Sequence, residues 1–218
     1  GSGVSSIGAL CFVMYIPLSV FYVLYQTLLR CQAVLFVHFL WYSLSMQHSS
    51  NRINHIVITG PPGAGKSTIV DNLCSEFGDI FQHVPEVATP VILNFGIAPG
   101  SKSEKFVFES SFQQALYRMQ KIYEEIAEDI ARYTGKKALL CDKGRTDIAA
   151  HLKGGMEEYE KLFSISHIQE SRDYDFVICL GLPSQEVYES IRRNNPARIE
   201  GYWRARELEE KLCVVWGE

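Results

Sequence analysis

Charged residues are almost missing from the beginning of this 218-residue sequence. Residues 1–51 contain one charged side chain, Arg30, whereas residues 52–218 contain all 25 acidic residues and every other basic residue. This split predicts two parts, an apolar segment over 1–51 and a globular domain over 52–218. The basic residues of the second part are dispersed and the net charge of the chain is −4, so no nucleic-acid partner is expected.

Closely spaced cysteines and paired metal ligands are missing as well. None of the six cysteines forms a C-x-x-C pair, and His151 and His167 have no second ligand at the spacing of a metal site. Two cysteines, Cys141 and Cys179, lie inside apolar runs that are typical of strands. These features predict buried, reduced thiols in a cytoplasmic domain and argue against a disulfide framework or a zinc site.

The longest run without a charge, Ile7–Leu29, is predicted to be helical, and its 23 residues are enough to span a bilayer. A second apolar run, Ala33–Met46, is too short to span it easily. Residues 7–46 are therefore either a membrane anchor or an extension that the working protein does not need. Arg30 beyond the first run favours an anchor with a cytoplasmic domain after it. The first residue is not methionine and Met46 could start an ordinary soluble domain, which favours the extension.

A glycine-rich loop follows the apolar run Ile56–Thr59 and leads into a predicted helix. The loop matches the pattern G-x-x-x-x-G-K-[ST], and its candidate binding residues are Gly60, Pro61, Pro62, Gly63, Ala64, Gly65, Lys66, Ser67 and Thr68. In this pattern backbone N–H groups surround a phosphate, Lys66 neutralises the β- and γ-phosphates, and the Ser67 hydroxyl binds Mg²⁺. The sequence therefore predicts a site for a nucleoside triphosphate with Mg²⁺. It contains no N-K-x-D guanine motif, which favours ATP over GTP.

Acidic residues follow two further predicted strands. Asp142 ends the apolar run 138–142, at the position of a second metal ligand in proteins with such a loop. Glu86 follows the predicted strand 80–84, at the edge of an open sheet where ligands bind, although a surface carboxylate is the alternative. Either acid is a candidate general base. For Asp147, a catalytic role competes with a simple position at the N-terminus of a helix.

Helical periodicity is strongest between residues 104 and 134. Its apolar positions predict one core stripe made of Phe108, Phe112, Ala115, Leu116, Met119, Ile122, Tyr123, Ile126 and Ile130. The intervening Glu124, Glu125, Glu128 and Asp129 are expected on a solvated face. With a strand over 175–180 and a final helix over 204–216, the pattern predicts a three-layer α/β fold. A mostly parallel sheet is flanked by helices, and the apolar N-terminal segment is expected to be helical.

An arginine-rich, helix-breaking stretch occupies residues 190–201. Guanidinium groups neutralise charge on a transferring phosphoryl group, so this stretch is predicted to form a lid with Arg198 as its best candidate. Ordinary surface pairing between glutamate and arginine is the alternative.

Four blocks, taken in order, resemble a known family. They are the loop with its strand at 55–68, and the segments 84–88, 141–152 and 194–198 with 205–208. Over residues 54–218 the chain resembles the AAA-type P-loop domain of the NadR and translocation-defect group. The resemblance implies a kinase-like P-loop fold in which Asp142 lies by the metal, Glu86 faces the acceptor and Arg198 belongs to the lid. Lys143 replaces the usual arginine of the third block, and family members continue beyond residue 218, so the C-terminus is expected to be truncated.

Two functions follow from these observations. The first is a kinase-like enzyme that transfers a phosphoryl group from Mg²⁺-ATP to a small acceptor or to water, with Lys66, Glu86, Asp142 and Arg198 as catalytic residues. The second is a nucleotide-gated regulatory module with slow hydrolysis, in which bound triphosphate orders the lid. A native membrane anchor through residues 7–46 would favour the second function.

Overall fold

A parallel sheet forms the centre of the computed structural model, which describes residues 12–16, 52–97, 102–103, 105–106, 109–193 and 200–217. In this part of the chain the sheet has five strands in the order β1-β5-β2-β4-β3. Their bounds are β1 Phe12–Ile16, β2 Asn54–Thr59, β3 Phe81–Val84, β4 Ala138–Asp142 and β5 Phe176–Leu180. All four neighbouring pairs are parallel, so their carboxyl ends meet at one edge of the sheet.

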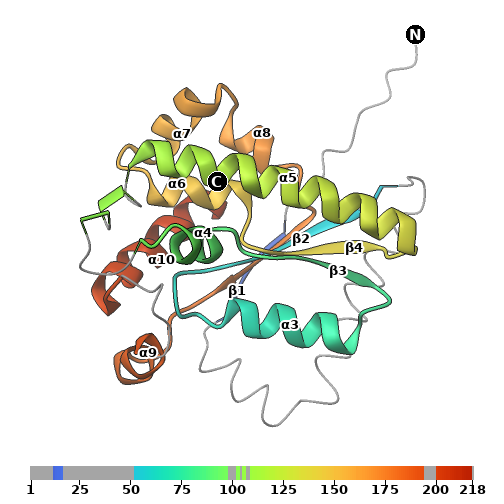
Figure 1. Ribbon diagram of the computed structural model, residues 1–218, viewed down its shortest axis with the longest axis horizontal. Helices are drawn as coiled ribbons and strands as arrows, with labels where there is room; N and C mark the ends of the chain where they lie inside the picture. The colour runs from blue at the N-terminus through green and yellow to red at the C-terminus, as the bar shows by residue number, and fades with distance from the viewer. Residues whose placement is uncertain are drawn as a thin grey trace.

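Helices cover both faces of the sheet (Figure 1). Their bounds are α3 Lys66–Glu76, α4 Ala88–Asn94, α5 Ser110–Thr134, α6 Ile148–His151, α7 Gly155–Phe163, α8 His167–Ser171, α9 Gln185–Arg192 and α10 Tyr202–Gly217, with a 3₁₀ turn η2 at Arg145–Asp147. Alternate residues of β2 point to opposite faces. Ile56 and Ile58 pack in a core with Val70 of α3, whereas Val57 packs in the core that includes α5, α7 and α10. The predicted three-layer α/β architecture is therefore confirmed.

Buried apolar residues explain why β4 and β5 occupy the inside of the sheet. Every residue of these two strands is buried, as expected for strands covered on both faces. Strands β2 to β5 lie within two residues of their predicted bounds, and the helix predicted after the glycine-rich loop is present as α3. Two short helices, α4 and α8, were not predicted, because helices of seven and five residues carry too few turns for a periodic signal.

The apolar N-terminal segment differs from its expected helical structure. Phe12–Ile16 forms β1, which pairs with β5 from Phe12↔Phe176 to Ile16↔Leu180. The helical prediction is wrong for these five residues, which form the edge strand next to β5. The rest of the segment, including Arg30 and Met46, lies outside the described residues. Within the described ranges, every helix is too short or too polar to cross a bilayer.

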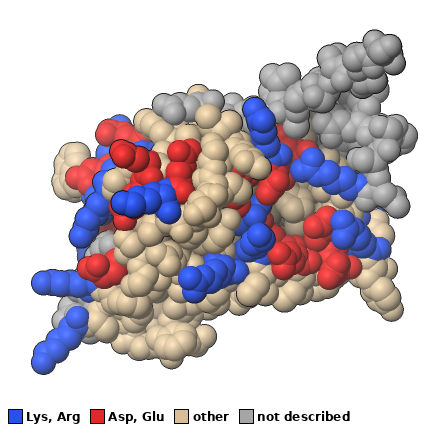
Figure 2. Space-filling model, turned by 90° about the horizontal axis from the view of Figure 1, so that it is seen from above, with Lys and Arg blue, Asp and Glu red and all other residues tan. Residues whose placement is uncertain are grey.

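The buried face of α5 is rotated away from the predicted stripe. Phe112 and Leu116 are buried as predicted, but Ile122, Ile126 and Ile130 are 51%, 53% and 42% exposed. Their predicted place in the core is therefore wrong. The same helix buries the side chains of Gln113, Gln120 and Glu124. Figure 2 shows a face of the molecule on which acidic and basic side chains are intermixed.

A buried arginine explains why Glu124 is in the interior rather than on a solvated face. Arg145, in η2, forms ion pairs with Glu124 of α5 at 3.1 Å, with Glu170 of α8 at 2.6 Å and with Asp173 at 2.7 Å. Tyr174 donates a hydrogen bond to Glu124 at 2.9 Å and accepts one from the backbone N–H of Arg145 at 2.8 Å. One guanidinium therefore joins η2, two helices and the segment that enters β5.

Candidate functional site

The glycine-rich loop turns at the carboxyl end of β2 and runs into α3. Three of its glycines, Gly60, Gly63 and Gly65, have φ angles of 142°, 86° and 84°. Such angles favour glycine, because a side chain there would be strained. A Cβ added to Gly60 would also lie 2.5 Å from the carbonyl oxygen of Leu180. The strand, loop and helix predicted from the G-x-x-x-x-G-K-[ST] pattern are thus present in the fold.

Lys66 is buried inside this loop, with 7% of its surface exposed. Its Nζ donates hydrogen bonds to the carbonyl oxygens of Gly60 and Pro61, both at 2.9 Å. Burial lowers the pKa of Lys66 to about 8, with a further decrease from the Lys143 ammonium, while nearby carboxylates oppose the shift. The ammonium group is therefore held at the mouth of the loop, where an anion would offset its cost of burial.

Ser67 and Asp142 bring two oxygen ligands together. The Ser67 hydroxyl donates to Oδ2 of Asp142 at 2.5 Å, and Asp142 is 2% exposed. The other carboxylate oxygen, Oδ1, is buried and has no hydrogen-bond partner among the described residues. A hydroxyl and a carboxylate with an unused oxygen suit Mg²⁺, which prefers oxygen ligands and keeps part of its water shell. These two residues therefore fit the predicted metal.

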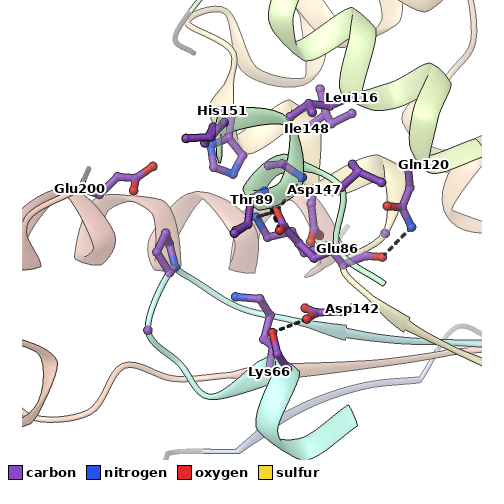
Figure 3. Close-up of a pocket in the computed structure, with 18 of the residues that line it drawn as sticks. Lys66, Glu86, Thr89, Leu116, Gln120, Asp142, Asp147, Ile148, His151 and Glu200 are labelled. Atoms are coloured by element: carbon purple, nitrogen blue, oxygen red, sulfur yellow. Dashed lines mark hydrogen bonds and ion pairs between the residues drawn. The ribbon is translucent and has the colours of Figure 1, made fainter. Parts of the chain in front are cut away.

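Glu86 faces the same cavity from the turn between β3 and α4 (Figure 3). Its carboxylate accepts backbone N–H bonds from Ala88 at 3.0 Å and Thr89 at 2.8 Å. Lys143 Nζ lies 3.5 Å from Glu86 Oε1. Burial acts to raise the pKa of Glu86, but the Lys143 ammonium and the Thr89 N–H outweigh it and keep the pKa below its usual value. Glu86 is thus an ionised carboxylate in a fixed orientation near neutral pH.

Lys143 follows β4 in a conformation that is rare for a side-chain-bearing residue, with a φ angle of 79°. Its N–H donates to the carbonyl oxygen of Ile58 at 3.1 Å, and its own carbonyl oxygen accepts from Gln120 Nε2 at 3.3 Å. Burial acts to lower the pKa of Lys143, but the Glu86 carboxylate raises it above the usual value. The turn after β4 therefore presents a second ammonium group to the cavity.

Asp147 lines the cavity but is occupied by two internal hydrogen bonds. It accepts the hydroxyl of Thr59, the last residue of β2, at 2.8 Å and the indole N–H of Trp216 at 2.5 Å. Burial raises the pKa of Asp147, although these bonds act to lower it. Asp147 is the N-cap residue of α6, as the helix-terminus interpretation expects, although its side chain makes no helix-capping bond. Thr59 and Trp216 were not identified from the sequence, because nothing in the pattern signals contacts across 88 and 69 residues.

The cavity extends from the phosphate loop toward α5 and has a volume of about 400 Å³. The part beyond Glu86 has apolar walls, including Phe112 and Leu116 of α5 and Ile148 of α6. Gln113, Gln120 and His151 also line it and were not among the predicted site residues. Burial, followed by the Lys143 ammonium, lowers the pKa of His151 to about 3, so its imidazole is neutral.

The structure places Lys66, Ser67, Glu86 and Asp142 around one cavity, as Figure 3 shows for three of them. Arg198 lies outside the described residues. Ile191 and Glu200, the described residues of this stretch that lie on either side of it, line the cavity.

Comparison with known families gives one finding for this chain. Residues 55–218 match a family described as an AAA domain, and the match covers most of the chain. A search of curated proteins gives no match. The match and the geometry of the loop agree that residues 55–218 are a P-loop nucleotide-binding domain.

Proposed function

The chain belongs to the AAA domain family of P-loop proteins, and from this premise we propose that it is a kinase-like phosphotransferase. It binds ATP with Mg²⁺ and transfers the γ-phosphoryl group to the hydroxyl of a small acceptor or to water. The finer likeness to the NadR and translocation-defect group is part of this proposal. The observation that carries it is the convergence of Lys66, the Ser67–Asp142 pair and an ionised Glu86 on one cavity.

The phosphate end of the cavity supports binding of the triphosphate. Backbone N–H groups of the loop and the Lys66 ammonium would hold the β- and γ-phosphates. Ser67 and Asp142 would hold Mg²⁺, which supplies charge neutralisation for the phosphates when it is bound. Arg198 is proposed to add a further positive charge, since the flanks of its segment line the cavity.

The acceptor end supports transfer to a hydroxyl group. The acceptor oxygen attacks the γ-phosphorus while the bond to the bridging oxygen breaks, so ADP leaves with that oxygen. The acceptor proton passes to Glu86, whose lowered pKa keeps it ionised. The apolar walls that include Phe112 and Leu116 exclude water from this end, which favours an organic acceptor.

A second candidate function is a nucleotide-gated regulatory module with slow hydrolysis. It is favoured by the position of α10, which starts at Tyr202, just after the arginine-rich segment. Near its end, Trp216 binds Asp147, which also binds Thr59, the residue before the phosphate loop. In this proposal, binding of the triphosphate changes the surface around α10, and a partner protein binds to that changed surface. Of the proposed membrane contact, residues 7–46, Phe12–Ile16 pair with β5 in the sheet. The other residues of this range remain a proposed membrane contact.

Two substitutions test the phosphate site. Lys66→Ala is expected to lower ATP affinity at least about tenfold, because it removes a charged contact to the phosphates. Asp142→Asn is expected to reduce Mg²⁺-dependent turnover far more than Mg²⁺-free nucleotide binding. Titration calorimetry measures the affinities, and transfer of labelled phosphate to a panel of small alcohols measures turnover.

The outcomes separate the alternatives. Unchanged ATP affinity in Lys66→Ala would refute the phosphate site itself. Transfer to a small alcohol supports the kinase, whereas release of phosphate to water alone at a slow rate supports the regulatory module.

A further inference from the structure

Lys143 has an unusual backbone conformation that is held by its surroundings. Apart from Ser164 at the end of α7, it is the only non-glycine residue with a positive φ angle in the described part of the chain. Such strain persists only where the surrounding structure holds it, and it concentrates at functional sites. Here both sides of the residue are held, by hydrogen bonds to Ile58 and Gln120.

The fixed turn directs the Lys143 ammonium into the cavity that contains the phosphate loop. Lys66, at the start of α3, and Lys143, directly after Asp142, both line this cavity. Each of the two ammonium groups influences the pKa of Glu86, Asp147 and His151, so both act on the same small volume. The carboxylates of Glu86, Asp142 and Asp147 offset part of the repulsion between these two ammonium groups. An anion bound between them would offset more of it.

Glu86 is a weak partner for Lys143 and can release it. Their separation of 3.5 Å exceeds the usual length of about 2.7–2.9 Å for a charged hydrogen bond. Glu86 also keeps two backbone N–H bonds, from Ala88 and Thr89, when the lysine is removed. Its carboxylate would therefore stay oriented and solvated by the backbone.

We propose that Lys143 is a catalytic cation that exchanges partners, binding Glu86 without nucleotide and the γ-phosphate of ATP when ATP is bound. The inference rests on the proposed function and names a residue that it does not include. The exchange frees Glu86 Oε1 to accept the proton of the acceptor hydroxyl. The acceptor oxygen forms its bond to phosphorus, the bond from phosphorus to the bridging oxygen breaks with its electron pair leaving on ADP, and Lys143 keeps its own protons throughout.

The test compares binding of a non-hydrolysable ATP analogue with binding of ADP, because only the former carries a γ-phosphate. With Mg²⁺ and the full chain, Lys143→Met is expected to weaken the analogue about tenfold or more and to change ADP affinity less than about twofold. Lys143→Arg is expected to restore most of the analogue affinity. The matched control is Lys161→Met, which removes an exposed lysine on α7 and should change neither affinity.

Substitution of Glu86, the partner of Lys143, is expected to change the analogue affinity in the opposite direction. Glu86→Gln is expected to tighten the analogue several-fold, because Lys143 no longer has a competing carboxylate. In the double variant with Lys143→Met this gain should disappear, which a double-mutant cycle measures directly. Thermal unfolding of each variant checks that the domain remains folded, and the Glu86→Gln arm decides the outcome where Lys143→Met does not fold.

Each result has a defined meaning. Equal losses for the analogue and ADP, no loss in Lys143→Met, or an unchanged analogue affinity in Glu86→Gln would overturn the exchange. A wild-type protein that prefers the analogue through Lys143 but transfers no phosphate would refute the proposed function and leave the exchange standing. If the wild type transfers phosphate and Lys143→Met transfers it equally well, the exchange is refuted and the proposed function stands.

Discussion

Two neutral histidines show how single residues connect this fold to pH. Burial of the ring, followed by the charge of Arg52, lowers the pKa of His55 to about 4. Burial and the charge of Lys143 lower the pKa of His151 to about 3. In the unfolded chain both side chains would titrate near 6.5, so folding prevents them from taking up protons.

The expected result is a loss of stability on acidification that begins below pH 6.5. Between pH 6.5 and about 4 these histidines bind protons in the unfolded state but not in the folded state. Each histidine therefore lowers the free energy of unfolding by about 1.4 kcal/mol for every unit by which the pH falls. His55→Gln and His151→Gln should each reduce this slope, and together they should remove most of it between pH 6.5 and 5. Urea unfolding at a series of pH values measures the slope. An unchanged slope in the double variant would contradict the assignment.

At the scale of elements, α10 ties the end of the described chain to the phosphate loop. Trp216, in its last turn, donates to Asp147, and Asp147 also holds Thr59, the residue directly before Gly60. The Trp216 ring lies so close to Gly144 that a Cβ there would meet it at 2.9 Å. One indole therefore supports the turns that carry Lys66 and Lys143.

Trp216→Phe is expected to lower the free energy of unfolding by about 1–3 kcal/mol, because it leaves the buried Asp147 carboxylate with one donor instead of two. ATP affinity should fall as well, since Thr59 positions the start of the phosphate loop. Trp203→Phe is the matched control, because that indole is 70% exposed and should tolerate the change. Equal stabilities of the two variants would show that the indole N–H bond contributes nothing.

Sequence reasoning was most successful where an element carries its own signal. The strand, glycine-rich loop and Lys66–Ser67 pair follow from local pattern, and so does the acid at the end of β4. It failed on α5, where the exposed Ile126 and the buried Glu124 exchange the places that periodicity predicts. Glu124 is buried because of Arg145, which lies 21 positions along the chain, and a helical pattern contains no information about that partner.

At the scale of the whole molecule, Arg145 joins four segments through ion pairs in the interior. It is 7% exposed, and it is the partner of Glu124 and Glu170, which are 4% and 1% exposed. Removing it would leave two buried carboxylates uncompensated, although Tyr174 and Tyr117 would still donate to them. A buried charge without its partner is far more costly than a missing surface pair.

Arg145→Met is expected to destabilise the protein by about 3–5 kcal/mol. Arg132→Met, which breaks an exposed pair with Glu128 on α5, should cost at most about 1 kcal/mol. Adding Glu124→Gln and Glu170→Gln to Arg145→Met should recover part of the loss, since the buried negative charges are then removed. Urea unfolding of the four proteins measures these differences, and failure of the triple variant to recover stability would point to packing rather than charge.

The pairing of β1 with β5 has a consequence for how the polypeptide is made. β1 is synthesised before the other described strands, yet its neighbour in the sheet, β5, ends at Leu180. At about 5–20 residues per second, the ribosome needs roughly 10–30 s to add the intervening chain. During that interval β1 lacks β5, the strand with which it pairs in the sheet. It can therefore join the sheet only after β5 has been synthesised.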